Sequence, residues 1–221
     1  MADKENIRNA YIDHVLTEGS RPKSVYIFAK NLQMSEAEFY ELFGSFDALE
    51  QSIWTDMGKS VIDEVKGQEV WAGYAAREKA LSFFYGFFEQ LKKSRSFAIY
   101  SLRNTPKGLN TPFVFDGLKA LFIDFAAEIL NEGLESGELT DRKFFAKRYK
   151  DALWGQLVFI LHFWVKDESA GFEKTDEAIE KGLNVTFDLF QRSPIDNLID
   201  YGKFLAQNGD LKGFMKFSEA N

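Results

Sequence analysis

Several side chains that carry chemistry in proteins are absent or scarce in this sequence. No cysteine occurs among the 221 residues, which excludes disulfide bonds, thiolate metal sites and cysteine nucleophiles. The two histidines, His14 and His162, are too few and too far apart for a multi-histidine metal site, and acid–base catalysis by histidine is not expected. No phosphate-binding glycine loop or nucleophile motif is present. We therefore expect no enzyme, no catalytic residues, no metal and no cofactor.

Long apolar runs and proline are also scarce. The most apolar run, residues 157–161, is far shorter than the roughly 18 residues that a membrane-spanning helix needs. The N-terminal segment lacks the apolar centre of a signal peptide, so we expect a cytoplasmic protein without a membrane span. Proline, which interrupts helices, occurs only at positions 22, 106, 112 and 194. Phenylalanine, in contrast, occurs 23 times, which indicates an aromatic interior.

Apolar residues recur at helical spacing along most of the chain, which predicts an all-α protein. Ser35 followed by Glu38 has the spacing of a capping box, in which each side chain bonds to the other residue's backbone at the start of a helix. In the helix expected at residues 140–167, the second half, residues 153–165, is apolar on almost every side. One side can face the interior of the protein, and another needs the surface of a partner. The ten expected helices cover roughly residues 7–19, 25–32, 35–44, 45–67, 77–93, 96–103, 112–137, 140–167, 173–191 and 193–209.

Residues 24–30 read Ser-Val-Tyr-Ile-Phe-Ala-Lys, and residues 34–49 read Met-Ser-Glu-Ala-Glu-Phe-Tyr-Glu-Leu-Phe-Gly-Ser-Phe-Asp-Ala-Leu. Together they resemble the helix-turn-helix of the TetR family of transcriptional regulators. Gln33 stands where that family usually has a glycine. Residues 132–139 resemble the turn that precedes the family's eighth helix. The positions that match the helix-turn-helix pattern are Val25, Ala29, Ser35, Phe39, Tyr40, Phe43, Ser45 and Leu49.

The resemblance implies a TetR-like fold with three parts. Residues 1–46 are expected to form a three-helix, helix-turn-helix DNA-binding domain, and residues 47–192 a helical ligand-binding and dimerisation body. Residues 193–221 are expected to form a C-terminal helical extension. The family's architecture implies a homodimer through the eighth and ninth helices, and two helix-turn-helix units that read a DNA operator.

The resemblance also implies two sets of site residues. For the serines and Tyr40, the alternative is that they cap helices or pack. For the aromatic residues, the alternative is plain core packing, and for His162 it is a bond to a carbonyl or contact with the partner subunit. The expected DNA contacts are Lys23, Ser24, Ser35, Glu36, Ala37 and Tyr40. The expected contacts with an apolar or lipid-like ligand are Phe84, Phe87, Phe88, Phe122, Phe125, Trp154, Phe159 and His162.

The charge of the N-terminal part favours a second hypothesis. Residues 1–57 hold five basic and ten acidic side chains and so carry a net charge of −5, within a chain whose net charge is −7. Non-specific DNA affinity comes from lysine and arginine contacts with phosphate. The alternative to a regulator is therefore a TetR-fold protein without DNA binding, similar to the lipid-binding accessory proteins of ubiquinone biosynthesis.

Overall fold

A computed structural model of the chain describes residues 3–103, 112–141, 146–191, 201 and 204–205. Within these residues every regular element is helical, which confirms the all-α prediction. The α-helices are α1 (Lys4–Glu18), α2 (Val25–Asn31), α3 (Glu36–Leu42), α4 (Phe46–Lys66), α5 (Ala76–Lys93), α6 (Arg95–Arg103), α7 (Asp116–Glu135), α8 (Tyr149–Lys166) and α9 (Glu173–Phe190). Short 3-10 turns lie at Trp71–Gly73, Phe113–Phe115, Ala146–Arg148 and Ala170–Phe172.

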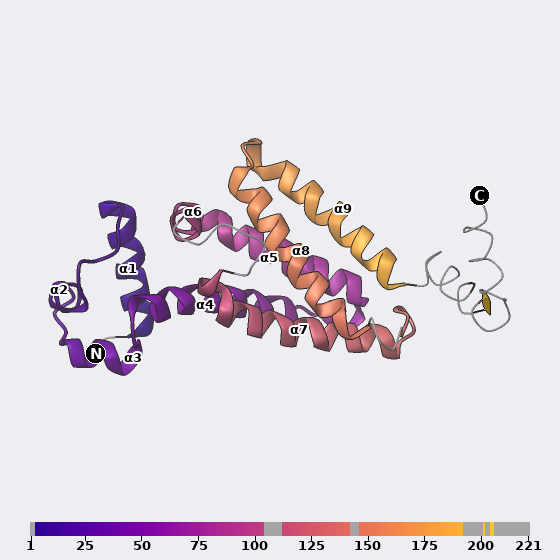
Figure 1. Cartoon of the computed structure of the whole chain (residues 1–221), viewed down its shortest axis with the longest axis horizontal. Coiled ribbons are helices and arrows are strands. Elements are labelled where there is room, and N and C mark those ends of the chain that lie inside the picture. Colours follow the sequence, from indigo (N-terminus) through magenta and orange to yellow (C-terminus); the bar gives the residue numbers. More distant parts are fainter. Residues whose placement is uncertain (1–2, 104–111, 142–145, 192–200, 202–203, 206–221) are drawn as a thin grey trace, which may run out of the picture.

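Helices α1, α2 and α3, with the first turns of α4, form a small bundle that we call the head (Figure 1). The ring of Phe46 lies at its centre. That ring stacks on Tyr11 at 5.7 Å and meets Phe28 and Phe39 edge-on at 5.5 Å and 5.6 Å between ring centroids. One aromatic cluster therefore fixes the three short helices against the start of α4.

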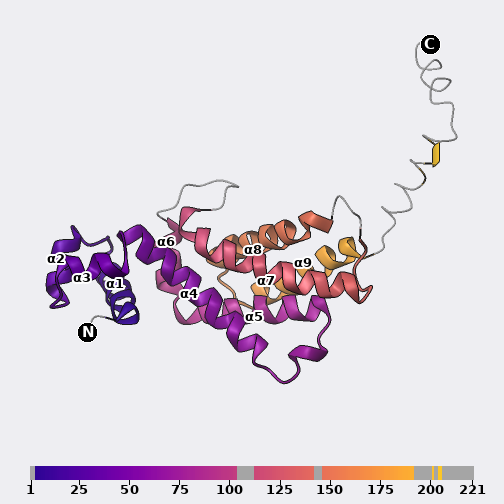
Figure 2. The same ribbon diagram turned by 90° about the horizontal axis from the view of Figure 1, so that it is seen from below.

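Helix α4 runs from the head along helices α5 to α9, which together we call the body (Figures 1 and 2). It lies very close to α7, because glycines occupy two contact points. A Cβ atom at Gly58 would come within 2.3 Å of the Leu118 side chain, and a Cβ atom at Gly117 would come within 2.3 Å of the Thr55 hydroxyl. These close approaches fix where α4 sits on the body, and with it the point from which the head projects.

Helices α5 to α9 form the body, with α8 and α9 side by side (Figure 1). The turn between these two helices is organised by Asp167, which accepts hydrogen bonds from the backbone and side chain of both Ser169 and Thr175 at 2.6–3.0 Å. Burial of this carboxylate opposes ionisation, but the four hydrogen bonds prevail and lower the pKa of Asp167 to about 2. The charged carboxylate thereby caps the start of α9 and holds it against α8.

Two of the expected helix boundaries were wrong. The eighth helix was expected to start at Thr140, but α8 begins at Tyr149, and the Thr140 N–H donates to the Phe190 carbonyl at the end of α9. Proline 112 was expected to open the seventh helix, but a 3-10 turn follows it and α7 begins at Asp116. The loop expected at residues 104–108 and nearly all of the tenth helix lie outside the described residues.

Gln33, in the turn between α2 and α3, has a φ of 56°, in the left-handed region that costs an L-residue about 1–2 kcal/mol. Glycine at this position removes the strain of the folded state but makes the unfolded chain more flexible, and the first effect is the larger. We therefore expect Gln33→Gly to raise the free energy of unfolding by about 0.5–1 kcal/mol. Chemical denaturation measures the gain. Gln68→Gly is the control, because Gln68 is an exposed turn residue without a positive φ and its replacement should destabilise. An unchanged or lower stability of Gln33→Gly would contradict the strain argument.

Candidate DNA-binding surface and aromatic core

The two serines of the expected DNA contacts cap helices. The Ser24 hydroxyl accepts a hydrogen bond from the Ile27 N–H at 3.2 Å and so starts α2. The Ser35 hydroxyl accepts from the Glu38 N–H at 3.2 Å, while the Glu38 carboxylate accepts from the Ser35 N–H at 2.7 Å. The predicted capping box is therefore confirmed, and its hydrogen bonds hold the pKa of Glu38 below its usual range.

The other expected DNA contacts are exposed at the same end of the molecule. Lys23 lies just before α2, whereas Glu36, Ala37 and Tyr40 lie on α3. The Tyr40 side chain is 53% exposed although its ring touches the edge of Phe39, so its hydroxyl is available to a binding partner. The head thus presents a capped α3 whose surface carries one phenol and several carboxylates.

Internal ion pairs occupy two of the five basic side chains of residues 1–57, and they leave the net charge of −5 unchanged. The Arg8 guanidinium pairs with Asp56 at 2.9 Å, and that of Arg21 pairs with Asp47 at 2.5 Å and with Glu50 at 2.7 Å. Both arginines are thereby committed within the protein. The remaining basic side chains of the first 57 residues are Lys4, Lys23 and Lys30.

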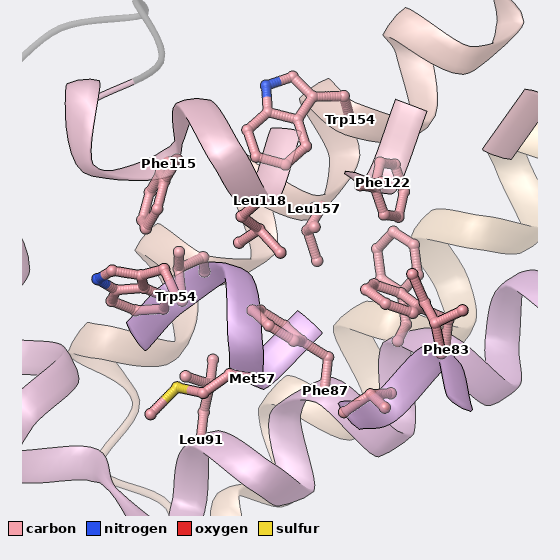
Figure 3. Packing of buried hydrophobic residues seen from close by; sticks show 14 of the residues in the cluster. Trp54, Met57, Phe83, Phe87, Leu91, Phe115, Leu118, Phe122, Trp154 and Leu157 are labelled. Carbon is pink, nitrogen blue, oxygen red and sulfur yellow. The ribbon is translucent and has the colours of Figure 1, made fainter. Parts of the chain in front are cut away.

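Six of the eight expected ligand contacts are buried in the interior of the body, and Figure 3 labels three of them, Phe87, Phe122 and Trp154. The ring of Phe122 contacts three of the others, at 6.1 Å from Phe84, 6.4 Å from Phe125 and 5.7 Å from Trp154 between ring centroids. Phe83, from the same aromatic stretch as Phe84, lies within 5.2 Å of both Phe122 and Phe125. The six residues are Phe84, Phe87, Phe88, Phe122, Phe125 and Trp154.

The other two expected ligand contacts, Phe159 and His162, do not belong to this interior. Both lie on the exposed side of α8, where the Phe159 side chain is 65% exposed and the His162 ring bonds to the Val158 carbonyl at 2.8 Å. The prediction that they line the same cavity was wrong. Because α8 is apolar on almost every side, its sequence did not indicate which apolar side faces the core.

A buried polar cluster at the junction of head and body escaped the sequence analysis. The Glu50 side chain is 1% exposed and accepts hydrogen bonds from the Tyr11 hydroxyl at 3.0 Å, the Arg21 guanidinium at 2.7 Å and the Ser101 hydroxyl at 2.5 Å. The Ser101 hydroxyl in turn accepts from the Trp54 indole N–H at 3.0 Å. One feature of the sequence did indicate that Glu50 is buried, because this residue falls on the same helical face as the apolar residues of α4.

Burial and the neighbouring carboxylate of Glu50 raise the pKa of the Tyr11 hydroxyl above its usual range, so Tyr11 stays protonated and remains a hydrogen-bond donor.

Two surface hollows that described residues line, of about 230 and 240 Å³, lie near the head. The first separates α1 from α2, and the second lies where α1 meets α4 and the end of α5. Among the described residues, no group of acidic or histidine side chains has the arrangement of a metal site. No helix in the described part of the chain has the length and apolarity needed to cross a membrane.

A helix-turn-helix head joined by the long helix α4 to a helical body is a TetR-like fold. Residues 79–205, more than half of the chain, match the family described as the tetracyclin repressor-like C-terminal domain, and the chain therefore belongs to the TetR family. No curated protein matches it in sequence.

Two solved structures share this fold. The TetR transcriptional regulator from Nitrosomonas europaea ATCC 19718 is 15% identical, with a TM-score of 0.59 over 83% of this chain and 96% of that one. A putative transcriptional regulator from Streptomyces coelicolor A3(2) is 14% identical, with a TM-score of 0.54 over 86% of this chain and 98% of that one. At such low identity the likeness concerns the fold.

Proposed function

We propose that this protein is a ligand-responsive repressor that binds a DNA operator as a homodimer and senses an apolar small molecule. The observation that carries the proposal is the head itself. It keeps a capped α3 with an exposed Tyr40, on a domain that α4 joins to an aromatic body. Glu36 and Ala37 on α3 and Lys23 just before α2 supply further contacts, and a glutamate that faces a base can accept from cytosine N4.

The exposed side of α8 supports the homodimer. Ala152, Gly155, Phe159 and Phe163 recur there at helical spacing, and all four are exposed. A Cβ atom added at Gly155 would meet nothing within 4 Å, so the stripe leaves room for a second helix to approach closely. Val185, 60% exposed, adds apolar surface on the neighbouring α9. A second copy of this surface is the partner we assign to it.

The aromatic interior supports an apolar ligand. The rings of Phe84, Phe122 and Trp154 supply apolar contacts from three different helices, α5, α7 and α8. Because these rings pack against one another, a ligand enters only by displacing some of them, and so it binds one arrangement of the body better than another. Such a difference in affinity is what ligand control of DNA binding requires.

The test of the regulator is a titration of the purified dimer with duplex DNA from the region upstream of its own gene, at two salt concentrations. A repressor should bind one segment of this DNA more tightly than unrelated duplex, and both affinities should fall as salt rises. The absence of binding to any duplex at low salt would reject DNA binding and would leave lipid binding as the function of the protein.

The second candidate function is lipid binding without DNA binding, and the acidity of the head favours it. Arg8 and Arg21, two of the five basic side chains there, are occupied by internal ion pairs. A buried aromatic interior suits a fatty acyl chain as well as it suits a regulator's effector.

We expect a lipid-like species to co-purify with the protein and to be visible by native mass spectrometry. Added fatty acids should also raise the melting temperature, because a ligand that binds only the folded state stabilises it. Phe122→Ala should weaken this rise, whereas Val70→Ala, an exposed change on another part of the body, should preserve it. A melting temperature that no member of a fatty-acid series changes, with no co-purified species, would contradict an apolar site.

A further inference from the structure

The Glu50 cluster joins three segments that belong to different parts of the molecule. Tyr11 lies on α1 and Arg21 in the turn that leads to α2, so both belong to the head. Ser101 lies on α6 of the body and is itself 1% exposed. Glu50 stands between them on α4, and each of its carboxylate oxygens takes a different side: one accepts from Tyr11 and Arg21, and the other from Ser101.

A carboxylate that is 99% buried is costly unless its hydrogen bonds are all made. If α6 moved away from α4, the Glu50 oxygen that faces Ser101 would lose its hydrogen bond. If the head rotated about α4, the same loss would fall on the oxygen that faces Tyr11 and Arg21. Both movements therefore act on the same buried carboxylate, which makes it a group through which one movement affects the other.

A chain of ring contacts connects this cluster to the aromatic interior (Figure 3). Trp54, whose indole N–H donates to Ser101, meets Phe115 edge-on at 4.7 Å. Phe115 lies 6.4 Å from Trp154, and Trp154 lies 5.7 Å from Phe122. A molecule that displaces Trp154 or Phe122 therefore disturbs side chains that lead, contact by contact, to the hydroxyl of Ser101.

We propose that Glu50 is the positioning residue that couples the orientation of the head to the arrangement of α6 and the aromatic interior. The proposal rests on the proposed function, since it names the group through which an apolar ligand alters the head. Glu50 touches neither DNA nor ligand in this scheme; it acts through Tyr11, Arg21 and Ser101. Replacing the Glu50 carboxylate should leave both binding surfaces intact and remove the coupling between them.

A double-mutant cycle on the full chain tests the coupling without any ligand. Tyr11 and Ser101 both bond to Glu50, and their helices α1 and α6 also pack directly against each other, so the part of their coupling that Glu50→Gln removes is the part that passes through the carboxylate. Tyr11→Phe and Ser101→Ala should each change the unfolding equilibrium constant, and together they should differ from the product of the single effects by about fivefold. In a Glu50→Gln background the two effects should multiply. Additivity in the wild-type background would overturn the proposal.

A second experiment measures the orientation of the head directly. Because the chain has no cysteine, Lys30→Cys on α2 and Asp124→Cys on α7 give a unique, exposed pair for spin labels. The distance distribution between them should be narrow in the wild type and clearly broader in Ser101→Ala or Glu50→Gln. Thr175→Ala is the matched control, because it removes a buried hydrogen bond at the α8–α9 turn, far from the cluster. A distribution that stays narrow in both cluster variants, or that broadens equally in the control, overturns the proposal.

The same labelled protein separates this inference from the proposed function. Palmitic acid serves as the apolar probe, and it should shift the distance distribution of the wild type but not that of Glu50→Gln. If the shift occurs and no duplex binds at low salt, the coupling stands and the regulator fails. If duplex DNA binds and its affinity responds to the probe equally in wild type and Glu50→Gln, the regulator stands and the coupling through Glu50 is rejected.

Discussion

Replacing Phe159 by glutamate should convert the protein from a dimer to a monomer at micromolar concentration. The Phe159 side chain, 65% exposed, lies in the middle of the apolar stripe on α8. In a two-fold interface both copies carry the change, so two phenylalanines are lost from the contact at once. Burial of a phenylalanine contributes roughly 1.5–3 kcal/mol, so the pair contributes roughly 3–6 kcal/mol before the cost of burying two carboxylates. We therefore expect the dimer to weaken by about a thousandfold or more.

Sedimentation equilibrium of the two proteins measures this effect. Val70→Glu is the control, because Val70 is 54% exposed and lies between α4 and α5, away from α8 and α9. That variant should remain a dimer, and both variants should keep the helical content of the wild type. A wild-type protein that is already a monomer, or a Phe159→Glu variant that associates as tightly as the wild type, would remove the basis for the proposed homodimer.

The helices were predictable because their ends carry local signals. Ser24, Ser35 and Ser45 each cap a helix with their own side chain, and such bonds involve residues only three apart in the sequence. The start of α8 was not predictable in this way. Thr140 bonds to the end of α9, fifty residues further along the chain, and no local pattern reveals that contact.

The same distinction applies to the candidate sites. The aromatic residues of α5 and α7 were predicted because each of these helices has a clear apolar side. Phe159 and His162 were misplaced because α8 has apolar side chains all round. The Glu50 cluster was missed because Tyr11, Glu50 and Ser101 are about forty or more residues apart, and their meeting depends on the packing of α1 and α6 against α4.

Removing two acids from α3 should raise the affinity for non-specific duplex DNA. Glu36 and Glu41 are exposed, whereas Glu38 holds the capping box and is left unchanged. A carboxylate about 8 Å from a phosphate is repelled by roughly 0.5 kcal/mol in water, so the four carboxylates of a dimer contribute roughly 2 kcal/mol. After screening by about 0.1 M salt, which reduces this to roughly 0.9 kcal/mol, we expect Glu36→Gln with Glu41→Gln to bind about fivefold more tightly.

Stability should change little in this double variant. Glu36 lies in the first turn of α3, where its charge favours the helix dipole by about 0.3–1 kcal/mol, and Glu41 lies near the other end, where its charge opposes the dipole. The loss at Glu36 and the gain at Glu41 offset each other, so a change in DNA affinity is not a consequence of unfolding. A melting curve of each protein checks this point.

The control removes the same charge from another part of the head. Asp13 and Glu18 lie on α1, at the hollow between α1 and α2. Asp13→Asn with Glu18→Gln lowers the negative charge of the head by the same amount without touching α3. If repulsion from the α3 surface limits binding, the affinity of the α3 variant for duplex DNA should increase far more than that of this control. A titration of each variant at two salt concentrations measures the difference. Equal increases in affinity would mean that only net charge matters.

A loss of preference for one DNA segment in the α3 variant would instead show that Glu36 or Glu41 recognises a base, because a glutamate that accepts from cytosine is specific where a phosphate contact is not.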